Sequence, residues 1–532
     1  MREKILSTVF LLFLFVVQTF AQSVVLSGNI TSDKTLTSDK TYLLSGFVRV
    51  KSGATLTIQP GTTIYGENST QGSLIIQPGG KLVAIGTVAN PIVFTSEFNK
   101  PGSSQQPTYG DWGGVILLGN APINVPGGTS GIEGPGDTFG GNDPADSSGA
   151  LKYVRIEYPG IAFSPNNEIN GLTFGGVGNR TLIDYVQVSY SGDDSYEWFG
   201  GTVNAKHLIA YRGVDDDFDT DFGFQGKLQF LVGLRDPQIA DVVSGSNGFE
   251  SDNDGAGSVN TPRTSPTWWN VTLVGPQVTT NSIFSSSFKR GMHLRRSSQN
   301  KVNNALILGW PTGLFIDGTN TVADAKANVM FVKNSIIAGS SVKNFQSTDA
   351  GWDVAAWFSG NGGKTFAATS DAKLVDAFNL NFPNFLPESG SPALTGGGTP
   401  PNDGFFDQTS YIGAFNTNDW TFGWAKFTDA TVTSVDEIKN LNVVPSSFNL
   451  SQNYPNPFNP STKIKYYLPE SGFVQIKVYN MLGQLVETLV NGYRASGTYE
   501  INFDASGLTS GVYIYRLQTS SNVISKKMIL LK

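Results

Sequence analysis

Short apolar runs, separated by glycine, asparagine, aspartate and proline, fill the chain from about Leu26 to Phe427. Most runs have the length of a β-strand, and the 3.6-residue spacing of amphipathic helices is nearly absent. The clearest runs are Ala54–Ile58, Leu74–Gln77, Leu82–Ile85, Ile92–Thr95, Val115–Leu118, Tyr153–Glu157, Tyr185–Ser189, Leu208–Tyr211 and Leu228–Val232. The pattern predicts an all-β domain built from many short strands.

Internal repeats indicate how these strands are arranged. The tetrapeptide IQPG at Ile58–Gly61 returns 18 residues later at Ile76–Gly79. Asp184–Asn204 and Ala205–Gly226, with 21 and 22 residues, each contain an apolar strand, an acidic turn and an aromatic strand. Repeats of this length that carry strands predict a right-handed parallel β-helix, with one repeat per coil.

The β-helix is predicted over residues 22–428, with interruptions. Tyr109–Ala150 is glycine-rich and almost strandless, so we expect an insertion there, and Asp353–Phe385 is irregular. The segment from Ser391 through Phe415 and then Asp419–Trp424 predicts a last coil and an aromatic cap, because an open coil would expose strand edges.

A second, smaller domain is predicted at 446–532, after a polar linker at 429–445. Six alternating runs, about 8–12 residues apart, favour a small immunoglobulin-like β-sandwich. They lie around Lys463–Tyr467, Val474–Tyr479, Leu485–Leu489, Thr498–Phe503, Gly511–Thr519 and Val523–Leu531.

Composition supports a turn-rich β protein with a packed core. The 532 residues include 61 glycines and 26 prolines, and 12% are aromatic, whereas only 15% are charged. The net charge of −7 argues against binding to nucleic acid. The segment from Ser446 on is net basic, so the acidic excess belongs to the β-helix region.

The N-terminus predicts export. Arg2 and Lys4 precede the apolar run Ile5–Val17, and Thr19 and Ala21 are small residues at the positions that a signal peptidase reads. Residues 1–21 are therefore predicted to be a signal peptide. No later segment is expected to span a membrane.

The chain has no cysteine. Disulfides, cysteine-bound zinc and a cysteine nucleophile are therefore excluded, as is a lipid-modified N-terminal cysteine. An exported protein without disulfides must draw its stability from its size, from hydrogen-bonded strands or from bound ions.

Five blocks of the C-terminal domain follow a recognisable order: Asn453–Pro460, Val478–Gln484, Asp504–Leu508, Ser510–Arg516 and Lys526–Met528. In this order they resemble the type A C-terminal sorting domain of the type IX secretion system, found in Bacteroidota and relatives. The resemblance implies binding to that secretion machinery, transfer to the outer cell surface, and then attachment to surface lipopolysaccharide or release. The secretion-signal residues that it implies are Gly511, Tyr513, Arg516, Lys526, Lys527 and Met528.

The β-helix region resembles secreted right-handed β-helix proteins of the same bacteria and, more remotely, the pectate-lyase-like superfamily. The resemblance depends on the coil pattern, on Gly110–Val115 and on three acidic coils, whose carboxylates lie at Asp193–Glu197, Asp215–Asp221 and Glu250–Asp254. It brings no decisive catalytic motif.

The three acidic coils predict a calcium site. Residues two apart in an extended strand face the same way, and Glu197 and Asp219 lie 22 residues, or one coil, apart. Crowded carboxylates suit Ca²⁺, although a solvated acidic face and catalytic carboxylates are alternatives. Asp217–Gly223 and Glu250–Gly255 resemble the start of an EF-hand calcium loop, but neither is followed by the Glu that closes such a loop at its twelfth position. The ligands would therefore come from several coils. The expected ligands are Asp193, Asp194, Glu197, Asp215, Asp217, Asp219, Asp221, Glu250, Asp252 and Asp254.

The densest basic run follows the acidic coils and offers weak catalytic candidates in Arg290, His293 and Arg295. A polysaccharide lyase needs a cation for the uronate carboxylate and a basic group for its α proton. The alternative is a basic patch that pairs with the acidic coils. A glycosidase needs two opposed carboxylates, and no spacing singles out such a pair.

Aromatic residues flank the acids. Trp198, Trp268 and Trp269 are candidate stacking platforms for sugars if exposed, and core residues if they point inward. Trp268 and Trp269 are adjacent, so one of them is expected to face outward.

These features leave three functions open. The leading hypothesis is a calcium-stabilised, adhesin-like surface protein that binds glycan or neighbouring surface material. The second is a calcium-dependent polysaccharide lyase or glycoside hydrolase. The third is a structural component of the surface coat.

Overall fold

The structure is a computed structural model that describes residues 22–164, 167–279, 281–427, 447–469, 472–494, 497–519 and 522–532. The predicted signal peptide at 1–21 and the predicted linker at 429–445 lie outside the described residues.

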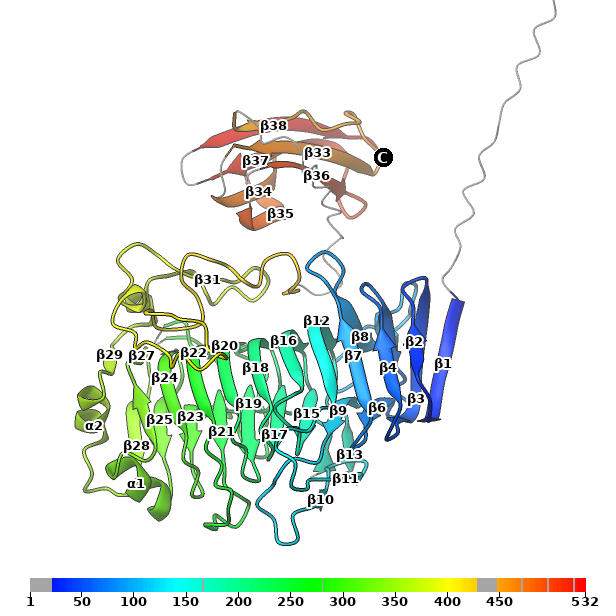
Figure 1. The fold of residues 1–532 in the computed structure, drawn as a ribbon. Coiled ribbons are helices and arrows are strands. Elements are labelled where there is room, and N and C mark those ends of the chain that lie inside the picture. Colours follow the sequence, from blue (N-terminus) through cyan, green and yellow to red (C-terminus); the bar gives the residue numbers. More distant parts are fainter. Residues whose placement is uncertain are drawn as a thin grey trace, which may run out of the picture.

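Most of the chain forms one 25-stranded parallel sheet, which is wound into a β-helix (Figure 1). Each central coil has one long strand and one short strand. The long strand bends once, so its two halves lie on two faces of the β-helix. Lys152 pairs with Asp184 and Val154 pairs with Val186, while Tyr153 at the bend has a φ of 51°. The short strands form the third face. The predicted parallel β-helix is confirmed.

The strands of the first coils are β1 (Gln22–Ile30), β2 (Lys34–Leu36), β3 (Lys40–Val50), β4 (Thr55–Ile58), β5 (Thr63–Gly66), β6 (Ser73–Ile76), β7 (Lys81–Ile85), β8 (Ile92–Ser96) and β9 (Gly114–Leu118). The long strands of the central coils are β12 (Gly149–Glu157), β16 (Leu182–Ser189), β18 (Asn204–Tyr211), β20 (Lys227–Leu234), β22 (Thr267–Val274) and β24 (Lys301–Leu308). The short strands are β15 (Leu172–Gly175), β17 (Tyr196–Phe199), β19 (Phe218–Asp221), β21 (Phe249–Ser251), β23 (Arg290–Leu294) and β25 (Thr312–Ile316).

The last coils contain β26 (Phe331–Lys333), β27 (Ile336–Ala338), β28 (Lys343–Ser347) and β29 (Lys364–Phe366), with helices α1 (Thr319–Lys326) and α2 (Val354–Gly360). Both helices lie at the end of the β-helix remote from β1 (Figure 1). The hairpins outside the main sheet are β10 (Ser130–Gly131) with β11 (Thr138–Phe139), β13 (Ala162–Ser164) with β14 (Asn167–Glu168), and β30 (Leu374–Asp376) with β31 (Asn384–Pro387). The first of these lies in the predicted insertion, which contributes β9 and the first two residues of β12 to the main sheet.

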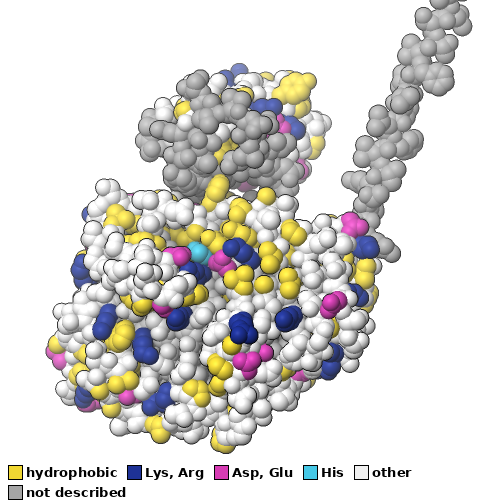
Figure 2. All heavy atoms as spheres, viewed as in Figure 1, with side chains coloured by type: hydrophobic (Ala, Val, Ile, Leu, Met, Phe, Trp, Pro, Cys, Tyr) yellow, Lys and Arg dark blue, Asp and Glu magenta, His cyan; other side chains and the backbone are white. Residues whose placement is uncertain are grey.

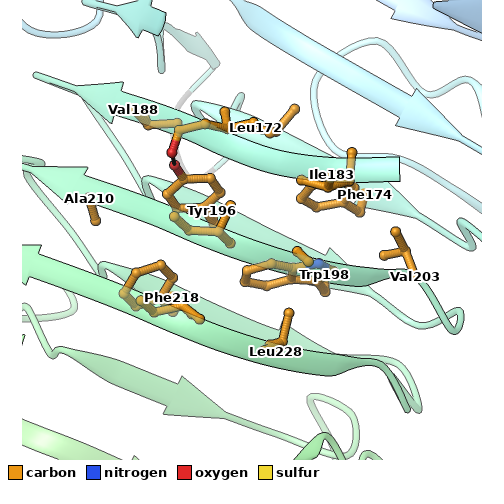
Figure 3. Packing of buried hydrophobic residues seen from close by; sticks show 14 of the residues in the cluster. Leu172, Phe174, Ile183, Val188, Tyr196, Trp198, Val203, Ala210, Phe218 and Leu228 are labelled. Carbon is orange, nitrogen blue, oxygen red and sulfur yellow. Dashed lines mark hydrogen bonds between the residues drawn. The ribbon is translucent and has the colours of Figure 1, made fainter. Parts of the chain in front are cut away.

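Alternation along the short strands fills the core. Tyr196 and Trp198 point inward and are fully buried, and Figure 3 shows them between residues of the neighbouring coils. The ring of Trp198 stacks on Phe174 at 5.3 Å, and the ring of Tyr196 stacks on Phe218 at 5.4 Å. Because successive strands pair in register, aromatic residues at equivalent positions form continuous stacks.

Residues 395–427, named here the strap, do not form the predicted last coil and cap. They run back along the flank of the β-helix, above β24 to β16 (Figure 1). Phe415, Trp420 and Trp424 of the strap pack in one buried cluster with Tyr211 and Phe230 of the long strands. That prediction is therefore wrong, because these aromatic residues cover the apolar outer surface of the long strands.

Side-chain amides hold the strap by its backbone. Gln187 accepts from Lys426 N at 2.8 Å and donates to Lys426 O at 2.6 Å. Gln229 makes the same pair of bonds with the backbone of Asp407. Asn270 and Asn304 add further bonds to backbone atoms of the strap.

The C-terminal domain has two small antiparallel sheets around its own core. One contains β32 (Asn449–Leu450), β33 (Ser461–Leu468) and β36 (Gly497–Asp504). The other contains β34 (Gly472–Asn480), β35 (Leu485–Arg494), β37 (Gly511–Gln518) and β38 (Val523–Leu530). The six predicted runs are all strands.

Replacing Gln187 by Ala should release the end of the strap. The substitution leaves the half-buried backbone N–H and C=O groups of Lys426 without their side-chain partners, which costs up to about 3 kcal/mol. We expect faster hydrogen exchange at 420–427 and a lower melting temperature. Gln408→Ala, which removes an exposed amide of the strap itself, is the control. Unchanged exchange at 420–427 in Gln187→Ala would contradict the role of the amide.

Candidate metal centre

The outward residues of three short strands form a column of acids. In the parallel register, Glu197 of β17 pairs with Asp219 of β19, and Asp219 pairs with Glu250 of β21. Glu250 in turn pairs with His293 of β23. Cross-strand neighbours in such a sheet are about 4.8 Å apart. We call these residues, with the acidic turns before β17 and β19, the acidic face.

The turn before each short strand adds further carboxylates. Asp194 stands two residues before β17 and Asp216 two residues before β19. The amide of Asp216 donates to Asp194 Oδ1 at 2.8 Å, and the amide of Asn247 donates to Asp216 Oδ1. Each turn is thus bonded to the turn of the next coil, which fixes the carboxylates above one another.

The carboxylates form three overlapping groups, and within each group the ligand oxygens lie within 4.8 Å of one another. The first triad is Asp193, Asp194 and Asp215; the second is Asp194, Glu197 and Asp219; the third is Asp216, Asp219 and Glu250. Oxygens that bind one Ca²⁺ lie about 2.3–2.6 Å from it, so such spacing fits shared coordination. The acidic face could therefore hold a metal ion.

Buried oxygen atoms without hydrogen-bond donors point to the same conclusion. Asn170 is 1% exposed and Asn247 is 2% exposed, and the Oδ1 atom of each has no partner. The amide nitrogen of Asn170 donates to Glu197, and that of Asn247 donates to Glu250 at 3.1 Å, so both amides lie against the acids. Oδ1 of Asp219 is also buried without a partner. A bound cation would satisfy such acceptors.

The acids of the first two coils are not neutralised by basic side chains. Within the described residues, no Lys, Arg or His forms an ion pair with the triad members of these two coils, which are Asp193, Asp194, Glu197, Asp215, Asp216 and Asp219. Burial, and then neighbouring carboxylates, raise the pKa values of Asp194, Glu197 and Asp219 well above the usual range. Burial raises the pKa of Asp215 to about 7.

The third acidic coil, in contrast, meets the basic run. His293 lies between Glu250, at 3.2 Å from Nδ1, and Asp317, at 3.1 Å from Nε2. Arg295 pairs with Asp252 at 2.7 Å and also with Glu250. Burial acts to raise the pKa of Glu250, but His293 and Arg295 outweigh it and lower the value.

Among the three catalytic candidates, Arg290 differs from the other two. Its guanidinium lies 5.2 Å from the ring centre of Phe315 and has no ion pair within the described part of the chain. His293 and Arg295 are held by carboxylates, so neither is a free base. His293 and Arg295 instead fit the alternative in which the basic run pairs with the acidic coils.

Four predicted ligands lie outside the triads. Asp217 points inward and pairs with Arg235 at 2.9 Å, and both side chains are fully buried. The expectation that Asp217 faces the same way as Asp215 and Asp219 is wrong, because the chain turns before β19 and alternation holds only within the strand. Asp252 pairs with Arg295, and Asp254 accepts from the amide of Ser258 at 2.9 Å.

Asp221 is the fourth. It faces outward on β19, its Oδ1 accepts from the amide of Phe222 at 2.6 Å, and burial raises its pKa to about 8. Asp216 belongs to the third triad although it was not among the expected ligands. Asn170 and Asn247 were missed because they carry no charge. Their signal was positional: each stands two residues before a short strand, as Asp194 and Asp216 do.

The three tryptophans belong to the packed interior. Trp198 and Trp268 are fully buried, and Trp269 is only 6% exposed. Trp269 does face outward, as alternation requires, but it packs against Phe406 of the strap at 6.1 Å. A sugar stacks only on an open ring face, so the expectation of stacking platforms at these residues is wrong.

Comparison with known families places the chain. Residues 28–376 match the family model described as a pectate-lyase-like β-helix domain. The chain belongs to this β-helix family. Residues 452–531 of the same β-helix protein match a secretion system C-terminal sorting domain. The sorting domain indicates secretion to the cell surface or the surroundings, and it implies contact with the type IX machinery.

No curated protein matches this β-helix protein. Among solved structures, it is similar to the enzymatically active domain of tailspike protein 2 of bacteriophage CBA120. The identity is 13% and the TM-score is 0.22, over 95% of this chain and 72% of that one. Within the described residues, no helix has the length and apolar character that crossing a bilayer requires.

The acidic face should make the metal-free protein less stable as the pH rises. Raised pKa values mean that the folded state binds protons more tightly than the unfolded chain does. This stabilisation is complete below about pH 4, where the unfolded carboxyls titrate. It is lost as the pH passes about 7 for Asp215 and about 8 for Asp221. In chelator, we expect the melting temperature to fall between pH 5 and pH 8.5. A melting temperature that rises over this range would contradict the burial of these acids.

Proposed function

We propose that this protein is an exported cell-surface β-helix protein that calcium stabilises and that binds acidic glycan or neighbouring surface material through its acidic face. The observation that carries the proposal is the group of crowded carboxylates on the coils of β17 and β19, which have no basic partner within the described residues, with unpartnered oxygens of Asn170 and Asn247 beside them. Burying like charges together is unfavourable unless a cation compensates them. Calcium takes six to eight oxygen ligands, so it suits this face better than Mg²⁺, which prefers a smaller octahedral shell.

The location of the protein favours this role. A sorting domain directs the β-helix to the cell surface, where disulfides are the usual device for small domains. This chain has no cysteine, so ions between coils would supply cross-links of another kind.

Binding of a ligand would proceed through the ion rather than through aromatic stacking. A triad supplies three carboxylates, which leaves room in a calcium shell for ligand oxygens. On the face drawn in Figure 2, acidic and basic side chains lie in small mixed groups among neutral and apolar ones. Recognition through the ion would be local and would favour carboxylate, sulfate or phosphate groups, because these supply anionic oxygens to a calcium shell.

Calcium should raise both stability and glycan binding. At calcium concentrations about 100 times Kd, the free energy of unfolding should rise by about 2.7 kcal/mol per independent site. Asp219→Asn should remove the gain from the site that Asp219 helps to form, and Asp407→Asn, which changes an exposed acid of the strap, should keep the full gain. The measurements are thermal unfolding, and binding to acidic and neutral polysaccharides, in calcium, magnesium and chelator. An equal melting temperature in calcium and chelator would rule the proposal out.

A calcium-dependent polysaccharide lyase is a second candidate, and Arg290 favours it. This half-buried arginine has no ion pair in the described chain, and burial lowers its pKa. With calcium bound, uronic-acid polymers should then yield unsaturated products that absorb in the ultraviolet. Arg290→Ala should abolish the product while leaving calcium binding intact. Product formation that persists in Arg290→Ala would exclude Arg290 as the base.

A further inference from the structure

We infer that the acidic face holds two cations, one in the first triad and one in the third, and that each ion joins two successive coils. The inference rests on the proposed calcium binding and adds the number of ions, their ligands and their structural task.

Ligand sharing decides the number. The second triad borrows Asp194 from the first triad and Asp219 from the third, so an ion there would compete with both neighbours. The first and third triads have no residue in common. Two ions can therefore each take three carboxylates of their own, and the second triad is left as the boundary between them.

The charges agree with two ions. The two outer triads contain six carboxylates, namely Asp193, Asp194, Asp215, Asp216, Asp219 and Glu250. One divalent ion would leave most of this buried charge uncompensated. Two divalent ions compensate four charges, and His293 and Arg295 already compensate Glu250. Asp194, Glu197 and Asp219 lie between the two ions and screen their repulsion.

Each triad spans one junction between coils. The first contains Asp193 and Asp194 from the turn before β17 and Asp215 from the turn before β19. The third contains Asp216 and Asp219 from the coil of β19 and Glu250 from β21. The adjacent residues Asp215 and Asp216 thus serve different ions, and the coil of β19 is held from both sides.

Unpartnered buried oxygens accompany both outer triads. Asn247 donates to Asp216 Oδ2 at 3.3 Å and to Glu250 Oε2 at 3.1 Å, so its own unpartnered Oδ1 lies beside the third triad. In the first triad, Oδ1 of Asp215 is buried without a donor, while its Oδ2 accepts from Ser244 at 2.6 Å. The oxygen of Asn247 would be a further ligand for the ion in the third triad, and the unpartnered oxygen of Asp215 is the one with which this triad member would bind the ion in the first.

Counting ions tests the inference. The exported full chain is stripped with chelator and titrated with Ca²⁺ by calorimetry, and native mass spectrometry counts the bound ions. We expect two. A count of one or three overturns the assignment while calcium stabilisation stands, and a count of zero removes the proposed calcium binding itself.

Two single substitutions test the separation of the sites. Asp193→Asn affects only the first triad and Asp216→Asn only the third, and each should leave one ion whose Kd stays within about threefold of the wild-type value. Asp407→Asn is the control and should bind two ions. Hydrogen exchange should increase at the β17–β19 junction in the first variant and at the β19–β21 junction in the second. Loss of both ions in either variant would show one shared site and overturn the inference.

Discussion

The in-register parallel stacking of coils is the constraint on which the rest of this molecule depends. Because equivalent residues of successive coils lie about one strand spacing apart, any residue type that recurs at one position becomes a column. Inside, the columns are aromatic, as in the stack of Phe174 on Trp198. Outside, the same rule collects carboxylates from Glu197 to Glu250. A favourable core and a strained cluster of like charges thus have one geometric cause.

The two flanks of the β-helix solve opposite problems. The outer surface of the long strands is apolar, and the strap covers it with Phe415, Trp420 and Trp424 while the amides of Gln187 and Gln229 bind its backbone. The outer surface of the short strands is acidic, and among the described residues no basic side chain pairs with its carboxylates on the coils of β17 and β19. One flank is completed by the chain itself, and the other calls for a cation. In a secreted protein without cysteine, the strap fastens coils to one another without a covalent bond, and the proposed ions would do the same on the other flank.

The basic run marks where the acidic column ends. His293 and Arg295 neutralise Glu250 and Asp252, so the third acidic coil is partly compensated before any ion binds. Arg290, next to this boundary, stays without an ion pair in the described chain. Glu250 and Asp216 of the third triad act electrostatically on Arg290, so both the binding and the lyase hypotheses concern the same end of the acidic column. The difference between them is whether a proton is removed after binding, and only product formation distinguishes the two.

The sequence by itself determined the β-helix, the sorting domain and the column of acids, because these depend on short-range alternation and on repeat length. Glu197 and Asp219 could be placed one coil apart by counting residues. Tertiary structure alone decided which side chains a distant segment covers or pairs. Trp269 faces outward as alternation requires, yet the strap buries it from more than a hundred residues away. Asp217 turns inward to Arg235, because the turn before β19 is not extended. Neutral Asn170 and Asn247 join the acids only through the stacking of turns, which charge patterns do not reveal.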